Sequence, residues 1–247
     1  MVRMSMKGRT PYPSVEKDLE ALGRAVNYNR WLYTLCKPYL GTRILEIGAG
    51  IGNYTKHWVR HGAVWATDCE DYYLDVLRST FRMKAVRVSR LPLDNWTKEQ
   101  RNEVRRFHSD SIVCLNVLEH VEDDVGSVAA MVDCISPGGR LIIIVPALAW
   151  LYSRVDANYG HTRRYDKRRL RLIRDKTHTR LLHLQYFNLL GTLAWLWNYK
   201  VLARPGLIER QVMVFDRLVP LLSRLERCTP PPFGLSLIAV LRKEDHD

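Results

Sequence analysis

Short apolar runs alternate with amphipathic stretches along the chain up to residue 146. Runs that are apolar on both faces are typical of strands buried in a parallel sheet, and helical periodicity between them is typical of the helices that cover it. The pattern predicts strands at residues 43–47, 63–67, 85–88, 111–115 and 140–145. It predicts helices at residues 15–37, where Ser14 can serve as the N-cap, and at 54–61, 72–81, 96–107 and 125–135. This alternation predicts a doubly wound α/β fold with helices on both faces of the sheet.

The pattern changes after residue 146, where a polar segment rich in aromatic side chains extends to residue 165. A connection of this length is usually functional or disordered, and its aromatic content argues against disorder. Asp166 then has the position of a helix N-cap. Beyond it the pattern predicts strands at 179–187 and 235–241, separated by amphipathic helices at 189–202 and 208–225. We therefore expect a single domain over residues 14–247, with a substrate loop at 146–165 and a helical insertion at 188–228.

Alternate glycines follow the first predicted strand, at Gly48, Gly50 and Gly52. Glycine permits positive φ and a close approach of backbone to a ligand, and the N-terminus of the next helix favours an anionic group. Asp68 ends the second strand roughly 20 positions after Glu46, the offset at which an acid binds ribose hydroxyls in nucleotide folds. These features predict a cradle for an adenosine-containing cofactor. The alternatives are a glycine loop without a ligand and, for Asp68, a helix N-cap.

Four features resemble the class I S-adenosylmethionine-dependent methyltransferases: LEIGAGIGNYT at 45–55, the acid Asp68, CLNVLEHVEDD at 114–124 and SPGGRLIIIVPA at 136–147. The resemblance implies a Rossmann-like, mostly parallel seven-stranded sheet with an antiparallel last strand. It implies S-adenosylmethionine as the cofactor and S-adenosylhomocysteine as the product. The cofactor contacts that it implies are Tyr28, Glu46, Gly48, Ala49, Gly50, Gly52, Asp68, Cys69, Ser89, Asn116, Val117 and His120.

Alternatives stay open at three of these positions. The family often places an acid after the third strand, against the adenine amino group, and here Ser89 and Asp94 both offer acceptors. After the fourth strand, nucleic-acid amino methyltransferases typically show a Pro-Pro-aromatic sequence, whereas Asn116 is followed here by valine and leucine. For His120 a cofactor contact and a hydrogen-bonded buried imidazole are equally good interpretations.

The second half of the chain resembles a bacterial subgroup of small methyltransferases, often encoded near glycosyltransferases or in natural-product and glycolipid pathways. The likeness lies in PALAWLYS at 146–153, GHTRRYDKRRL at 160–170 and PPFGLSLIAVLRK at 231–243. It implies a small-molecule, natural-product or lipid-linked glycan acceptor. We predict His161 as a general base, because histidine accepts a proton near neutral pH, with Tyr165 or Asp156 orienting the substrate. The alternative is that these residues only pin the loop, and many family members need no base. The predicted substrate contacts are Trp31, Tyr152, Arg163 and Arg164.

The formal net charge of the 247-residue chain is +12, which suits nucleic acid, an anionic membrane surface or an acidic substrate. We see no RNA-binding appendage in the sequence and expect no nucleic-acid partner. Basic residues crowd the stretch 163–180, which together with Trp195 and Trp197 can contact an anionic lipid surface. The five cysteines are scattered, so we predict neither a disulfide framework nor a metal site.

Residues 1–13 are basic and lack the apolar core of a signal peptide, and we expect them to be flexible. The apolar stretch 187–203 is short for a membrane span. We therefore expect a cytoplasmic methyltransferase, in contact with the inner membrane face at most peripherally. The competing hypotheses are an RNA methyltransferase, a non-catalytic protein that binds S-adenosylmethionine, and a nicotinamide-dependent oxidoreductase. The glycine spacing G-x-G-x-G disfavours the last of these.

Overall fold

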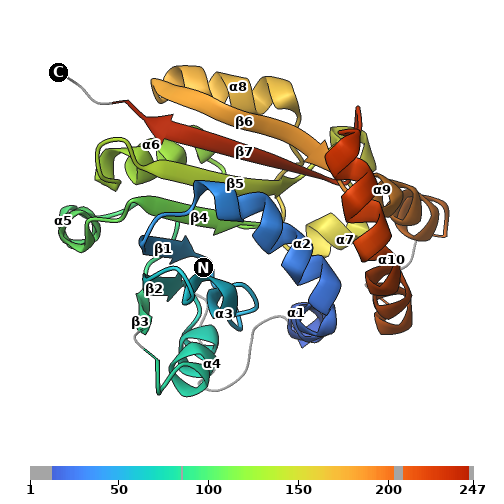
Figure 1. The fold of residues 1–247 in the computed structure, drawn as a ribbon, viewed down its shortest axis with the longest axis horizontal. Coiled ribbons are helices and arrows are strands. Elements are labelled where there is room, and N and C mark those ends of the chain that lie inside the picture. The colour runs from blue at the N-terminus through green and yellow to red at the C-terminus, as the bar shows by residue number, and fades with distance from the viewer. Residues whose placement is uncertain (1–12, 85, 203–207, 245–247) are drawn as a thin grey trace.

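The computed structural model describes residues 13–84, 86–202 and 208–244. A seven-stranded sheet with strand order β3-β2-β1-β4-β5-β7-β6 runs through the molecule (Figure 1). The strands are β1 (Arg43–Ile47), β2 (Ala63–Asp68), β3 (Val86–Arg90), β4 (Ser111–Leu115), β5 (Arg140–Pro146), β6 (Thr179–Phe187) and β7 (Ser236–Lys243). The strands predicted from the apolar runs are confirmed, with ends that move by one or two residues.

The first five strands pair in parallel, whereas β7 lies between β5 and β6 and is antiparallel to both. The predicted Rossmann-like sheet with an antiparallel last strand is therefore confirmed. Strands β1 and β4 are neighbours although β2 and β3 separate them along the chain. The strand order reverses at this pair, and ligands of open α/β sheets bind at the carboxyl ends of the strands beside such a point.

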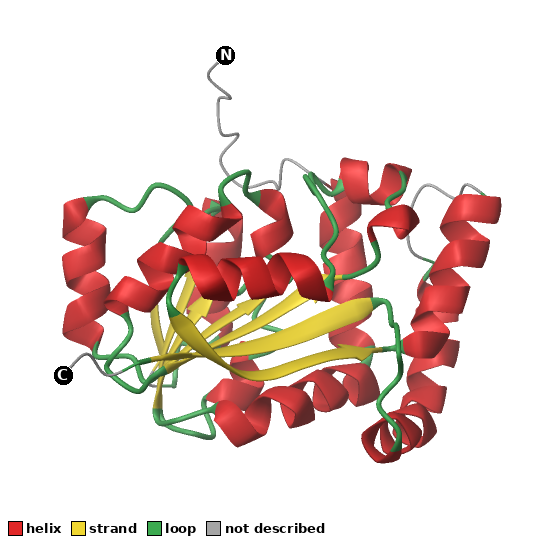
Figure 2. Cartoon of the chain, turned by 90° about the horizontal axis from the view of Figure 1, so that it is seen from above, coloured by secondary structure: helices red, strands yellow, loops and turns green. Residues whose placement is uncertain are grey.

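Helices cover both faces of the sheet (Figure 2). They are α1 (Pro13–Arg24), α2 (Val26–Cys36), α3 (Thr55–Trp58), α4 (Asp71–Thr80), α5 (Lys98–Phe107), α6 (Asp124–Cys134), α8 (Lys167–Lys176), α9 (Leu189–Trp195) and α10 (Glu209–Cys228), besides the short α7 described below. One apolar cluster joins α5, α6 and α8 to one face of the sheet, and a second joins α2, α3 and α10 to the other. Burial of both faces explains why the strand sequences are continuously apolar.

The single helix predicted at 15–37 is wrong, because α1 and α2 are separated at Ala25. Ala25 has φ −75° and ψ 73°, outside the helical region. The start of α2 is satisfied from far along the chain, since Asp216 of α10 accepts hydrogen bonds from the backbone N–H groups of Asn27 (3.3 Å) and Tyr28 (2.8 Å). Helix α1 begins at Pro13, so the cap predicted at Ser14 is also wrong. Residues 1–12 of the predicted flexible segment lie outside the described residues.

Two further helices differ from their predicted form. The helix predicted at 54–61 is reduced to α3, because the turn after β1 extends to Tyr54. The helix predicted at 189–202 consists of α9 followed by the π-helical η4 (Leu196–Val201). Together α9, η4 and α10 form the helical insertion, which connects β6 to β7 and stands at one end of the sheet (Figure 1).

The segment between β5 and α8 is folded back on itself. It contains η3 (Ala149–Leu151) and α7 (Arg154–Asn158). Its two ends meet, since the N–H of Tyr165 donates to the carbonyl of Pro146 at 2.8 Å and the N–H of Leu148 donates to the carbonyl of Tyr165 at 3.0 Å. Asp166 caps α8 as predicted, by accepting a hydrogen bond of 2.7 Å from the N–H of Arg169. Within the described ranges, no helix combines the length and apolarity needed to cross a bilayer.

Candidate active site

The turn after β1 holds its glycines at positive φ: 69° at Gly48, 54° at Gly50 and 84° at Gly52. Such angles disfavour any other residue. Space adds a second restriction at Gly48, where a Cβ would lie 2.3 Å from Cγ2 of Val117, just after β4. At Gly50 the nearest neighbour of a Cβ would be Cδ1 of Leu19 at 3.8 Å. The turn therefore presents bare backbone, packed tightly against β4 at Gly48 and open at Gly50.

The carboxylate of Asp68, at the end of β2, faces this turn. Its Oδ2 accepts a hydrogen bond of 2.9 Å from the N–H of Gly50, and its Oδ1 accepts from the N–H groups of Cys69 (2.8 Å) and Glu70 (3.1 Å). Burial raises the pKa of Asp68 despite these hydrogen bonds. The N-cap of α4 is Glu70 rather than Asp68. Asp68 is therefore held against the glycine turn by its hydrogen bond to Gly50, and it is not the N-cap of α4.

A cavity of about 670 Å³ lies at the carboxyl ends of β1, β2, β4 and β5. This is within the range of about 300–1,000 Å³ that is typical of small-molecule sites. One part, which we call the cradle, is lined by the glycine turn, Asp68 and Asn116. The other part, the aromatic chamber, is walled by α2, the segment after β5 and the helical insertion. Its rings are Tyr28, Tyr159, Trp195, Tyr199 and Phe215.

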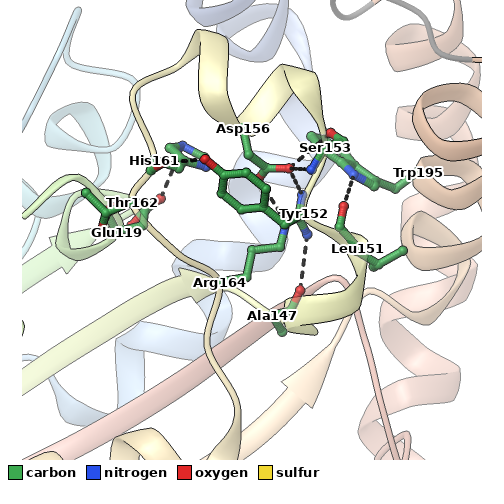
Figure 3. A network of polar contacts seen from close by, with 10 residues as sticks. All are labelled: Glu119, Ala147, Leu151, Tyr152, Ser153, Asp156, His161, Thr162, Arg164 and Trp195. Carbon is green, nitrogen blue, oxygen red and sulfur yellow. Dashed lines mark hydrogen bonds and ion pairs between the residues drawn. The ribbon is translucent and has the colours of Figure 1, made fainter.

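A buried polar network borders the aromatic chamber (Figure 3). Asp156 has no exposed surface, and its two oxygens accept hydrogen bonds from Arg164 at 2.8 and 3.2 Å. Nδ1 of His161 lies 3.1 Å from Oδ1 of the same carboxylate. Burial alone would raise the pKa of Asp156, but the hydrogen bonds from His161 and Arg164 together lower it. An ionised Asp156 accepts the Nδ1 proton of His161 and leaves the lone pair on Nε2.

Comparison with known proteins relates the part of the chain that forms the glycine turn to methyltransferases. A family model described as a methyltransferase domain matches residues 45–141. The ubiquinone biosynthesis O-methyltransferase of Aeromonas salmonicida is 30% identical over 114 residues, which are 46% of this chain and 47% of that enzyme. The mitochondrial ubiquinone biosynthesis O-methyltransferase of Schizosaccharomyces pombe is 29% identical over 106 residues, 42% of this chain and 38% of that enzyme. The matched region covers less than half of the length of either of these two relatives.

Solved structures share the fold over most of the chain. The S-adenosylmethionine-dependent methyltransferase from Mesorhizobium loti superposes with a TM-score of 0.56 at 15% identity, covering 83% of this chain and 92% of that one. Residues 45–141 thus match the methyltransferase domain family, and the fold is shared with S-adenosylmethionine-dependent methyltransferases. These findings support S-adenosylmethionine as the cofactor, as the resemblance of the glycine turn and Asp68 implies.

Many of the predicted site residues of this chain come together in one cavity. Those that line it are Tyr28, Gly48, Ala49, Gly50, Asp68, Cys69, Asn116, Val117, His120, His161 and Arg164. They derive from α2, the ends of three strands and the segment after β5, which are far apart in sequence. Whether each contacts the cofactor stays a prediction.

Glu46 does not line the cavity, which corrects its place among direct cofactor contacts. It is 3% exposed, and its two oxygens accept hydrogen bonds from the hydroxyl of Thr55 (2.6 Å) and the indole N–H of Trp58 (2.9 Å). Burial raises the pKa of Glu46 to about 7. Glu46 therefore fastens α3 onto β1 directly behind the glycine turn, and its predicted role in shaping that turn stays a prediction.

The predicted cofactor or substrate contacts Gly52, Ser89 and Trp31 also lie outside the cavity lining. Gly52 packs against α4, where a Cβ would lie 2.6 Å from the ring of Phe81. The hydroxyl of Ser89 accepts a hydrogen bond of 2.7 Å from the indole N–H of Trp65. Trp31 is buried against Phe187, with ring centroids 5.6 Å apart. Leu91 and Leu93 line the cradle after β3, where we expected a polar adenine contact.

In the segment after β5, the predicted roles of Tyr165, Tyr152 and Arg163 are not supported by their positions. Tyr165 is fully buried and donates a hydrogen bond of 3.1 Å to the carbonyl of Leu118. Tyr152 donates to the carbonyl of His161 at 2.8 Å, and Arg163 pairs with Asp124 at 3.2 Å. These residues pin the loop, which is the alternative stated above for Tyr165. Arg164 does line the cavity, but Asp156 already neutralises its charge.

Glu119 is a site residue for which the sequence analysis assigned no contact. It lines the cavity wall, is fully buried, and neither of its carboxylate oxygens has a hydrogen-bond partner within the described part of the chain. Burial raises the pKa of Glu119 to about 7, although the nearby His161 opposes the shift. Burial also lowers the pKa of His120 to about 4. In the sequence, Glu119 and His120 are recognisable as adjacent polar residues shortly after β4. The contact of His161 with them depends on the tertiary structure.

Proposed function

We propose that this methyltransferase transfers the methyl group of S-adenosylmethionine to a hydroxyl oxygen of a small molecule with an aromatic or apolar body. The observation that carries the proposal is the division of one cavity into a cradle and an aromatic chamber. The cradle offers bare backbone and a carboxylate, and the chamber offers rings and an oriented imidazole. The relatives from Aeromonas and Schizosaccharomyces are named O-methyltransferases, which favours oxygen as the acceptor atom.

In this proposal Asp68 binds the ribose hydroxyls, since a carboxylate accepts two hydrogen bonds from a vicinal diol. The backbone of Gly48 and Gly50 receives the amino-acid end of the cofactor, and Leu91 and Leu93 pack against the adenine. The sulfonium is itself reactive, so the main task of the protein is to align the acceptor oxygen and exclude water. The new O–C bond forms while the C–S bond breaks, and the sulfur leaves as a neutral thioether.

Calorimetric titration with S-adenosylhomocysteine tests the cradle. Asp68→Ala should weaken binding by roughly 2–4 kcal/mol, because it removes charge-assisted hydrogen bonds to the ribose. Asp71→Asn is the matched control, since Asp71 is exposed and pairs with Arg90 at the surface. Equal affinities for Asp68→Ala and the unaltered protein would remove Asp68 from the cofactor site. Titration with NAD should give no heat.

The acceptor hydroxyl is proposed to lie against Nε2 of His161, a residue that lines the cavity beside Glu119. His161→Ala should then lower the rate of methyl transfer by roughly 10²–10⁴-fold and leave S-adenosylhomocysteine affinity unchanged. Transfer of labelled methyl from S-adenosylmethionine to a panel of phenols and other alcohols, with RNA as a parallel substrate, identifies the acceptor class. Labelling of RNA alone would support the RNA methyltransferase alternative.

A lipid-borne acceptor is a finer proposal, which rests on the outer face of α10. Val214, Leu218, Leu221 and Leu225 recur at helical spacing and are 45–61% exposed. Three exposed arginines lie beside this apolar stripe, spaced seven residues apart: Arg210, Arg217 and Arg224. An apolar stripe flanked by arginines is typical of helices that lie in the interface of an anionic bilayer. Because α10 also walls the aromatic chamber, a lipid-linked acceptor would enter directly from the membrane surface.

Co-sedimentation with vesicles tests this surface. The protein should pellet with vesicles that contain phosphatidylglycerol and much less with phosphatidylcholine alone. Leu218→Glu/Leu221→Glu should abolish pelleting, whereas Met83→Glu, at an exposed methionine in the turn after α4, should not. Retention of binding in the double variant would refute the proposed contact. A dimer that disappears in the double variant would instead identify the stripe as a subunit interface.

A further inference from the structure

The strongest unexplained feature of the cavity is the carboxylate of Glu119. A fully buried carboxylate without a hydrogen-bond partner is costly, and proteins keep such groups where a ligand completes their bonding. Oε1 of Glu119 lies 3.8 Å from Nε2 of His161. The ligand-capable atoms of Glu119, His120 and His161 all lie within 4.8 Å of one another. The imidazole rings of the two histidines meet edge to face, with centroids 4.8 Å apart.

We propose that Glu119, His120 and His161 bind a divalent first-row transition-metal ion, of which Zn²⁺ and Mn²⁺ are the test cases. Two imidazoles and one carboxylate are donors that suit these ions, whereas Ca²⁺ and Mg²⁺ prefer sites built from oxygen alone. Metal–ligand distances of about 2.0–2.2 Å require the three donor atoms to draw together by roughly 1 Å. Rotation of the Glu119 side chain contributes to this movement, because neither of its carboxylate oxygens has a hydrogen-bond partner among the described residues.

The surroundings of His161 have the arrangement found behind metal ligands. A histidine that binds a metal typically donates its other ring N–H to a carboxylate, which sets the tautomer and aims the free nitrogen. Asp156 takes this role at Nδ1, and Arg164 holds Asp156 through both of its oxygens. Nε2 of His161 is thereby directed at Glu119.

Three protein ligands leave a coordination position open toward the cavity, as in catalytic metal sites. Resting on the proposed function, this position would receive the acceptor hydroxyl and lower its pKa, so that the proton is lost to solvent before methyl transfer. The ion would then perform the task predicted for His161 as a general base, and His161 would act as a ligand.

The experiment is calorimetric titration of the untagged, EDTA-treated chain with ZnCl₂, MnCl₂ and MgCl₂. We expect one Zn²⁺ per chain, weaker Mn²⁺ binding in keeping with the usual order of divalent affinities, and no Mg²⁺ binding at comparable concentrations. Glu119→Gln preserves shape and should weaken Zn²⁺ and Mn²⁺ binding by more than roughly tenfold. Glu122→Gln, at an exposed acid three positions along the chain, should bind as the unaltered protein does.

Absence of Zn²⁺ and Mn²⁺ binding, or unchanged affinity in Glu119→Gln, would overturn the proposal. Should Glu119→Gln fail to fold, His161→Ala, at a partly exposed side chain, gives the same test. Parallel titration with S-adenosylhomocysteine separates the two proposals, since metal binding does not require the cofactor. Loss of S-adenosylhomocysteine binding but not of metal binding in Glu119→Gln would assign the carboxylate to the cofactor and would also overturn the metal site.

Discussion

The contact between Gly48 and Val117 gives the sharpest test of how the cradle is built. Gly48→Ala places a Cβ 2.3 Å from Cγ2 and 3.1 Å from Cγ1 of Val117, at a φ of 69°. The left-handed conformation costs about 1–2 kcal/mol for a non-glycine residue, and overpacking of this kind costs about 1–3 kcal/mol. Gly48→Ala should therefore lower the free energy of unfolding by about 2–5 kcal/mol.

Gly50→Ala separates the two costs. Its φ of 54° imposes the same backbone strain, but the nearest atom to its Cβ lies at 3.8 Å. Gly50→Ala should lose only the strain term, about 1–2 kcal/mol. Adding Val117→Ala to Gly48→Ala removes both clashing γ carbons and leaves the Cβ of residue 117 at 3.3 Å. The double-mutant cycle should return a favourable coupling of about 1–3 kcal/mol.

Urea denaturation measures these quantities at matched m-values for five proteins: the unaltered chain, Gly48→Ala, Gly50→Ala, Val117→Ala and the Gly48→Ala/Val117→Ala double variant. S-adenosylhomocysteine titration of Gly48→Ala and of the double variant then shows whether the restored turn binds again. Equal losses for Gly48→Ala and Gly50→Ala, or a coupling near zero, would refute the view that β4 packs against the glycine turn and sets its shape.

Three further predictions follow from buried polar contacts. Burial raises the pKa of Glu46 from 4.5 to about 7, so between these pH values the folded protein holds a proton that the unfolded chain releases. The free energy of unfolding should therefore fall by up to about 3 kcal/mol as the pH rises from about 5 to 8. In thermal melts Glu46→Gln should flatten that fall. Asp216→Ala should lower the free energy of unfolding by about 1–2 kcal/mol, because α2 loses its cap, whereas Glu209→Gln at the exposed pair with Arg24 should cost less than about 1 kcal/mol in the same urea titration. Tyr159→Phe breaks the hydrogen bond to Asp18 that joins the segment after β5 to α1. Without this link across the cavity, S-adenosylhomocysteine should be released roughly tenfold faster in stopped-flow measurements. An unchanged release rate would show that this hydrogen bond does not help to retain the ligand.

The sequence by itself determined the sheet and half of the cavity. Strand positions follow from local apolar runs, and the glycine turn and Asp68 follow from residues at the ends of two such strands. These are short-range features, because a parallel strand buried on both faces must be apolar along its length and its ligand must lie at its carboxyl end. Asp166 was predictable for the same reason, since a cap acts within one turn of its own helix.

The tertiary structure alone decided which polar residues face the cavity. Glu46 and Tyr165 have the chemistry of site residues, but their partners lie behind the turn and beneath the loop. The break between α1 and α2 depends on Asp216, nearly two hundred positions along the chain. Glu119 gains its significance only when the loop after β5 brings His161 against it. Local pattern fixes which face of a strand or helix is buried, whereas the partner of a polar group depends on long-range packing that no short window of sequence contains.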